Sequence, residues 1–207
     1  MNHRFFGNIV LTFLIVSLLG GCFGGRSAKT HFYLLGESTG SAPFQQNNAA
    51  TGEKIIGVGP VEVAEYLDRP QIVTRSGQNE IHFAEYDRWA EPIKDGFARV
   101  MAANLSNLLG TEQVAPFPWR SSTILDYQVT IKVVRFDGEP GGSTSLVALW
   151  SLYGRENREI LKWNKFTGTE ICEKKDFESL VAAKNRLIEK FSAEVAGVIR
   201  SDAASLP

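Results

Sequence analysis

The strongest constraint on the fold is a strict alternation of apolar and polar side chains between residues 125 and 133. The apolar positions are Leu125, Tyr127, Val129, Ile131 and Val133, and the polar positions between them are Asp126, Gln128, Thr130 and Lys132. A period of two sends successive side chains to opposite faces of an extended strand. This stretch therefore predicts a strand with one buried face, and it places a sheet in the fold.

Two further strands are expected directly after this one. Turn residues at 137–142 lead into the segment 146–153 (LVALWSLY), and a second turn at 154–157 leads into a strand at 160–172. Neighbouring strands joined by short turns predict an antiparallel meander. Because the segment 146–153 is apolar on both faces, we expect it to lie centrally in the sheet.

The part of the chain before residue 90 predicts shorter strands. These are residues 32–35 (FYLL) as a buried strand, 55–63 interrupted or bulged at Gly59-Pro60, and 71–75 with 80–86 as a hairpin. Between the first two strands, residues 36–52 are rich in Ser, Thr, Asn, Gln and Gly and predict a long loop.

Two segments have the spacing of three and four apolar residues that is typical of helices. The first begins near Pro92 and ends at Gly110, a residue suited to a left-handed helix end. The second has Asp176 as its N-cap and extends to about Arg200. The predicted fold class is α/β: a single domain with a mostly antiparallel mixed sheet and two long helices packed on it.

The N-terminal segment has the pattern of a secretory signal. Arg4 provides a positive charge, and residues 9–19 read IVLTFLIVSLL. This apolar stretch is too short to span a bilayer, which takes about 20 residues, and it is typical of a signal-peptide core.

The residues that follow, Leu19-Gly20-Gly21-Cys22, resemble the bacterial lipobox. That resemblance implies a diacylglyceryl group on the Cys22 thiol, cleavage before Cys22, and acylation of the new amine. We therefore expect a lipoprotein signal peptide at 1–21, the lipidated cysteine and a flexible linker at 22–30, and the folded domain at 31–207. The alternative is a plain signal peptide that is cut nearby.

Sorting and cysteine usage follow from the same assignment. Phe23 stands where many lipoproteins retained at the inner membrane carry Asp, so the resemblance to that sorting rule implies the periplasmic face of the outer membrane. With Cys22 lipidated, Cys172 has no partner in its own chain, and burial at the end of a strand is the expectation we favour over pairing between molecules.

The overall composition argues against several function classes. The chain has 22 Lys and Arg against 23 Asp and Glu, a formal net charge of −1, and this balance does not favour a nucleic-acid partner. Two cysteines and three histidines leave few ligands for a metal site, and no common nucleotide, hydrolase or metal motif is present. We expect no cofactor, no metal and no enzymatic activity.

One polar segment, residues 61–92, carries arginines and aromatic residues that no core pattern requires. Both residue types are enriched at energetically important positions of protein interfaces. The candidate partner-binding residues are Tyr66, Asp68, Arg69, Arg75, Arg88 and Trp89. The alternative is structural: Tyr66 and Trp89 cover the sheet edge while Asp68 and Arg69 pair within a turn.

The chain, including this segment, resembles the PqiC/YmbA family, also called the ABC-type transport auxiliary lipoprotein component. The resemblance is carried by FYLL at 32–35, EYLDRPQIVTR at 65–75 and RWAEP at 88–92, followed in order by Asn104-Leu105-Ser106, Pro118-Trp119 and Asp126-Tyr127. It covers the whole mature chain. One departure is Ala64, where many members have proline.

The resemblance implies an outer-membrane lipoprotein of an intermembrane lipid transport system, which docks an MCE-domain protein of a PqiB-like system at the outer membrane and supports membrane integrity. An inner-membrane ABC-type or PqiA-type component would be an indirect partner, outer-membrane lipid would hold the acyl anchor, and a homo-oligomer is conceivable if the MCE assembly is a ring. The alternatives are a lipoprotein that carries an acyl chain itself and a purely structural envelope lipoprotein, with a hydrolase as the weakest candidate.

Overall fold

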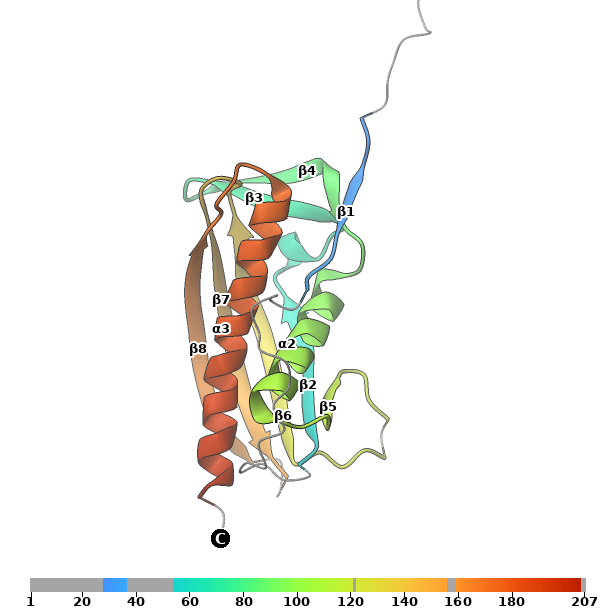
Figure 1. Cartoon of the computed structure of the whole chain (residues 1–207), viewed down its shortest axis with the longest axis vertical. Coiled ribbons are helices and arrows are strands. Elements are labelled where there is room, and N and C mark those ends of the chain that lie inside the picture. The colour runs from blue at the N-terminus through green and yellow to red at the C-terminus, as the bar shows by residue number, and fades with distance from the viewer. Residues whose placement is uncertain (1–27, 37–53, 121, 156–158, 206–207) are drawn as a thin grey trace, which may run out of the picture.

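The computed structural model describes residues 28–36, 54–120, 122–155 and 159–205. The signal peptide, Cys22 and nearly all of the predicted loop at 36–52 lie outside these ranges. Within them are eight strands of one sheet, two α-helices and a short 3₁₀ helix (Figure 1). The strands are β1 (His31–Tyr33), β2 (Ile56–Val63), β3 (Gln71–Ser76), β4 (Glu80–Trp89), β5 (Val114–Pro116), β6 (Tyr127–Gly138), β7 (Ser143–Gly154) and β8 (Ile160–Ile171); the helices are η2 (Glu65–Leu67), α2 (Ile93–Leu109) and α3 (Phe177–Ala203).

The meander β6-β7-β8 forms the main part of the sheet, as predicted. β7 pairs with β6 on one side and β8 on the other, antiparallel to both over nearly its whole length. On its other edge, β6 pairs in parallel with β2, whose register shifts between Val58 and Val61. That shift is the bulge predicted at Gly59-Pro60.

A second part of the sheet lies at one end of the molecule. β3 and β4 form the predicted hairpin, β1 adds to β4 in parallel, and β3 meets β6 at a single pair, Thr74 with Gly138. Figure 1 shows this end near the first residues of β1 and α3, opposite the C-terminus.

Both helices pack on the same face of the sheet and form one core with it. The largest side chains that are fully buried there include Phe97 from α2, Trp150 from β7 and Phe191 from α3. Their rings approach one another edge-on or tilted, with centroids 6.2–6.3 Å apart for the Phe191 pairs. The predicted fold class, a mixed and mostly antiparallel sheet with two helices packed on it, is confirmed. Neither helix in the described ranges combines the length and apolarity needed to cross a membrane.

The helix ends agree with the sequence prediction. Asp176 accepts a hydrogen bond from the backbone N–H of Ser179 at 2.7 Å, the geometry of an N-cap. Gly110 ends α2 in the left-handed region, at φ 68°. Cys172, the residue after β8, is free and buried, as expected.

Three elements differ from the sequence prediction. The strand predicted at 32–35 covers His31–Tyr33 and is an edge strand, paired with β4 alone; it is not buried, because one of its faces is open to solvent, with Phe32 and Leu34 exposed while Leu35 is buried. β6 continues to Gly138, because Asp137 and Gly138 still pair with Ser145 and Thr144 of β7, so the turn begins only afterwards. β5 was not predicted, since its pairing with β2 depends on contacts distant in sequence.

Replacing Asp176 with alanine removes the N-cap of α3 without touching the core. We expect Asp176→Ala to lower the free energy of unfolding by about 1 kcal/mol, because the N–H of Ser179 loses its acceptor. Urea unfolding of the two proteins measures the difference. Asp176→Asn is the matched control, since asparagine caps equally well; an equal loss in both variants would contradict the capping role.

Candidate functional site

A buried carboxylate lies where the two parts of the sheet meet. Asp137 near the end of β6 has no solvent exposure. Arg75 of β3 binds it with two hydrogen bonds, from Nε to Oδ1 at 2.7 Å and from Nη2 to Oδ2 at 3.0 Å. Tyr66 Oη of η2 donates to Oδ2 at 2.6 Å, and Arg135 Nε donates to Oδ1 at 3.0 Å. Four donors therefore satisfy both oxygens of this carboxylate.

The hydrogen bonds keep Asp137 charged in spite of its burial. Burial alone would raise the pKa of its carboxyl, but the hydrogen bonds from Arg75, Tyr66 and Arg135 outweigh it and lower the pKa below its ordinary value. Burial and the bond to Asp137 raise the pKa of Tyr66 to about 12. Tyr66 and Arg75, two of the six candidate partner-binding residues, thus have their polar groups directed into the fold.

A buried lysine lies close to the same point. Lys184 of α3 is almost fully buried; its Nζ donates to the carbonyl oxygen of Phe136 at 2.5 Å and lies 4.2 Å from the centre of that ring. Burial lowers the pKa of Lys184 to about 7, and the negative charge of Asp137 opposes this shift. Together with Arg75 and Tyr66, Lys184 connects η2, β3, β6 and α3 at one end of the domain.

Three of the other four candidates line a single open pocket. This "Arg69 pocket" has a volume of about 300 Å³ and is lined by Asp68, Arg69, Pro70, Trp89, Ala90, Glu91 and Pro92. It lies where β3 begins, β4 ends and α2 begins. Arg69 and Trp89 flank it, and arginine and tryptophan are residue types enriched at interface hot spots.

The side chains of the Arg69 pocket are held by their neighbours. The Nε of Arg69 donates to the carbonyl oxygen of Tyr66 at 2.8 Å, and its guanidinium lies 3.7 Å above the ring of Phe83. Asp68 pairs with Lys94 at 3.6 Å, with each side chain a little under half exposed. Trp89 is only 8% exposed and is also part of the core.

Arg88, the remaining candidate, pairs in register with Phe32 of β1. Its side chain is partly buried, and within the described residues its Nε is buried without a hydrogen-bond partner.

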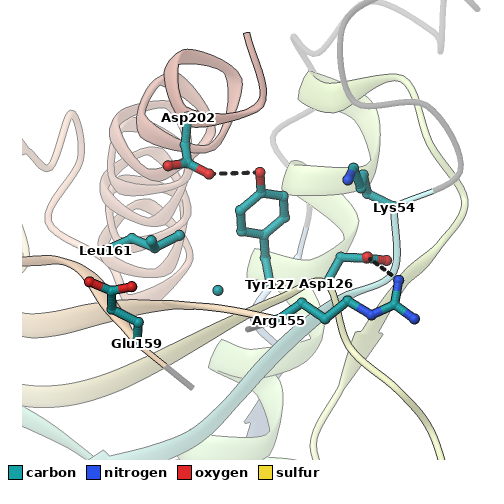
Figure 2. A pocket seen from close by; sticks show the side chains of 8 residues that line it. Lys54, Asp126, Tyr127, Arg155, Glu159, Leu161 and Asp202 are labelled. Carbon is teal, nitrogen blue, oxygen red and sulfur yellow. Dashed lines mark hydrogen bonds and ion pairs between the residues drawn. The ribbon is translucent and has the colours of Figure 1, made fainter. Parts of the chain in front are cut away.

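A second pocket lies at the opposite end of the domain, beside the C-terminal end of α3 (Figure 2). Its volume is about 350 Å³, and its lining residues are Lys54, Asp126, Tyr127, Gly154, Arg155, Glu159, Leu161 and Asp202. Tyr127 Oη donates to Asp202 at 2.9 Å, and Arg155 pairs with Asp126 at 3.3 Å. Positive and negative side chains thus share this "Tyr127 pocket".

Both pockets are lined by charged side chains of both signs. In the Tyr127 pocket, burial and the bond to Asp202 raise the pKa of Tyr127 to about 12, so its hydroxyl stays protonated near neutral pH. Neither pocket is lined by a histidine or cysteine among the described residues, and no group of three potential metal ligands occurs in the described ranges. Cys172 lies in the core, where burial raises the pKa of its thiol.

The described domain is thus a sheet covered by helices on one face, with open charged pockets at two ends. The chain belongs to the family of ABC-type transport auxiliary lipoprotein components, whose family model matches residues 33–196. The resemblance stated from the sequence is thereby confirmed. The family description names a lipoprotein that assists transport, and this places the chain among membrane-anchored envelope proteins.

Known relatives agree with the family. The intermembrane transport lipoprotein PqiC of Escherichia coli K12 is 26% identical over 134 residues, which are 65% of this chain and 68% of PqiC. The crystal structure of protein XCC0632 from Xanthomonas campestris has a TM-score of 0.67 at 18% identity, covering 85% of this chain and 99% of that one. The crystal structure of an uncharacterized protein also reaches 0.67, at 19% identity, covering 82% and 98%. These structures share the fold.

Asp137 and Lys184 were not among the residues predicted from the sequence. Asp137 stood beside Gly138 in what was predicted to be a turn. Lys184 carried a detectable signal: it lies four residues after Leu180 and three before Leu187, at an apolar position of the helix.

The buried lysine predicts a rise of stability with pH. The pKa of Lys184 is about 7 in the fold against 10.5 ordinarily. As the pH falls, the unfolded chain takes up this proton first, so the free energy of unfolding should decrease from about pH 10.5 to about pH 7 and increase in the other direction.

We expect wild type to be more stable at about pH 8.5 than at about pH 7, and Lys184→Met to show a clearly smaller rise, because methionine does not titrate. In urea unfolding over this range the tyrosines stay protonated, whereas the Cys172 thiol, whose pKa is raised only in the fold, begins to ionise in the unfolded chain at about pH 8.5 and opposes the rise. Lys190→Met, at an exposed lysine of the same helix, should retain the wild-type rise. All three proteins retain Cys172, so the comparison is between their slopes. Equal slopes in all three proteins would refute the assignment.

Proposed function

We propose that this protein is an outer-membrane-anchored periplasmic lipoprotein that docks an MCE-domain protein of a PqiB-like intermembrane lipid transport system. The observation that carries the proposal is membership of the transport auxiliary lipoprotein family over residues 33–196, together with the PqiC relative. Lipid on Cys22 holds the domain at the membrane. An inner-membrane ABC-type or PqiA-type component takes part only indirectly, through the MCE assembly.

The Arg69 pocket is the docking surface that we favour. Arg69 and Trp89 have the residue types that dominate interface energies, and Asp68 adds an exposed charge. Because the bond to Tyr66 and the stacking on Phe83 already fix Arg69, binding would cost little side-chain entropy. In this proposal, Tyr66 and Arg75 position the surface through Asp137 instead of contacting the partner.

Anchoring would add to the affinity of this surface. A lipid anchor confines the domain to a thin layer at the membrane, which raises its effective concentration toward any assembly that reaches that layer. Two or more acyl chains hold such an anchor stably. If the MCE assembly is a ring, several copies of this lipoprotein would meet it together.

The packing of the core favours docking over the carriage of an acyl chain by the domain itself. A carrier needs an enclosed apolar space between helices and sheet. In the described part of the chain, Phe97, Trp150 and Phe191 occupy that region and pack against one another. The two pockets described above are open and bordered by charged residues.

The role of the anchor can be tested by purifying the full-length protein from crosslinked cell envelopes. We expect an MCE-domain protein to co-purify with wild type and to be strongly reduced with Cys22→Ala, because the tether is lost. If recovery of the MCE-domain protein is undiminished with Cys22→Ala, that protein is still a partner, but the domain surface binds it without the anchor. Extraction and mass spectrometry of the same samples would reveal a lipid bound by the domain. Absence of an MCE-domain protein from both the wild-type and the Cys22→Ala samples would contradict docking.

The docking surface can be tested with Asp68→Ala and Arg69→Ala in the same purification. Trp89 is less suitable, because its burial means that truncation also destabilises the core. We expect the double variant to lower recovery of the MCE protein by about tenfold or more while secretion and lipidation continue. Arg155→Ala, an exposed arginine in the Tyr127 pocket, is the matched control. Equal recovery of the MCE protein with the double variant and with Arg155→Ala would show that the Arg69 pocket is not the docking surface.

A further inference from the structure

The first strand leaves two large apolar side chains uncovered. Along β1 and the residue pair after it, Tyr33 and Leu35 point inward: the Tyr33 ring packs near Phe177 at the start of α3, and Leu35 is buried. Phe32 and Leu34, which alternate with them, are 65% and 53% exposed. Within residues 28–36, 54–120, 122–155 and 159–205, no side chain covers these two residues, and an edge strand with one apolar side toward solvent is typical of a contact surface.

The neighbouring strand, β4, extends this surface with an arginine and an exposed tyrosine. Phe32 lies next to Arg88 of β4, and Tyr86, two residues earlier on β4, is also exposed. Aromatic rings with a cationic side chain among them are typical of protein surfaces at the boundary between lipid and water.

Basic and apolar residues lie at the same end of the molecule. Lys29 precedes β1, and Lys174 and Lys175 precede α3; all three are exposed. Ile171, at the end of β8 just before these lysines, is exposed as well. Figure 1 shows that the first residues of β1, the end of β8 and the start of α3 share one end of the domain. Lys174 and Lys175 stand between the equally exposed Glu173 and Asp176, so the lysines can pair with individual phosphate groups while the apolar side chains carry the contact.

The sequence limits how far this end can be from the anchor. Cys22 lies nine residues before His31, and a chain of that length spans at most about 30 Å even when fully extended. The end of the domain at which β1 begins (Figure 1) is therefore the end that the anchor draws to the membrane.

From this juxtaposition we infer that Phe32 and Leu34 insert into the headgroup region of the phospholipid leaflet that holds the anchor, with Tyr86, Arg88, Lys174 and Lys175 around them. The inference rests on the proposed lipidation of Cys22. It gives the domain a fixed orientation, with the Tyr127 pocket away from the membrane. Since Trp89 pairs in register with Tyr33 of β1, the Arg69 pocket lies beside the membrane-contacting strand.

The test uses the mature lipidated protein in vesicles of phosphatidylethanolamine and phosphatidylglycerol. Leu34→Cys is labelled with an environment-sensitive NBD dye, and quenching by lipids with a spin label near the headgroup is measured. Ile160→Cys is the matched control, because Ile160 is a similarly apolar residue, 55% exposed, at the start of β8 at the other end of the domain. Cys172 is buried and stays unlabelled in the folded protein.

We expect the label on position 34 to be quenched at least about threefold more than the label on position 160, because interfacial side chains reach about 5–10 Å into the headgroup boundary. Equal quenching at the two positions overturns the inference. A blue shift at position 34 that depends on protein concentration and not on the lipid quencher also overturns it, in favour of contact with a second copy.

The same samples separate this inference from the proposed function. Flotation with the vesicles and the mass of the intact protein report whether Cys22 is acylated and anchors the chain. An acylated protein that floats, with label 34 unquenched, refutes the membrane contact alone. A protein that carries no acyl group refutes the anchor, and with it the premise of the contact.

Discussion

The ion-paired carboxylate of Asp137 is the interaction on which the rest of the structure depends. It lies where β6 ends and β3 begins to pair with it, so it joins the meander to the hairpin that carries β1. A charge without solvent exposure is tolerable only because two arginines and a tyrosine hydroxyl satisfy both of its oxygens. Removing any one of these donors would leave an oxygen of the buried carboxylate without one of its hydrogen bonds. The position of η2, and with it Arg69, follows from this one group.

Local patterns predicted the elements whose neighbours are close in sequence. The alternation at 125–133 gave β6, the turns after it gave β7 and β8, and Asp176 and Gly110 marked helix ends because caps depend on adjacent residues. The parallel pairs of β2, β5 and β1 could not be predicted in this way. Their partners lie distant in the chain, and the apolar run at 32–35 looks the same whether a strand is central or at an edge.

The candidate site was predictable in composition but not in orientation. Arginines and aromatic residues in 61–92 indicated a surface, and two of them, Arg69 and Trp89, line one pocket together with Asp68. The direction of Tyr66 and Arg75 depends on Asp137, which lies 71 and 62 residues away in sequence. No pattern within the segment could reveal that partner. Lys184 could have been noticed, since a lysine at an apolar helix position indicates either a buried charge or a break in the face.

In the proposed function, rigidity and attachment serve one purpose. A lipid tether alone would let the domain turn freely at the membrane, and a docking pocket would then face every direction. Contact through β1 would remove that freedom, and the Asp137 cluster would transmit the fixed orientation of β1, β4 and β3 to η2 and Arg69. The pocket would therefore be presented beside the leaflet, where an arriving assembly has to release or collect lipid. The buried charge, which contributes nothing to partner contact itself, would thus determine where that contact occurs.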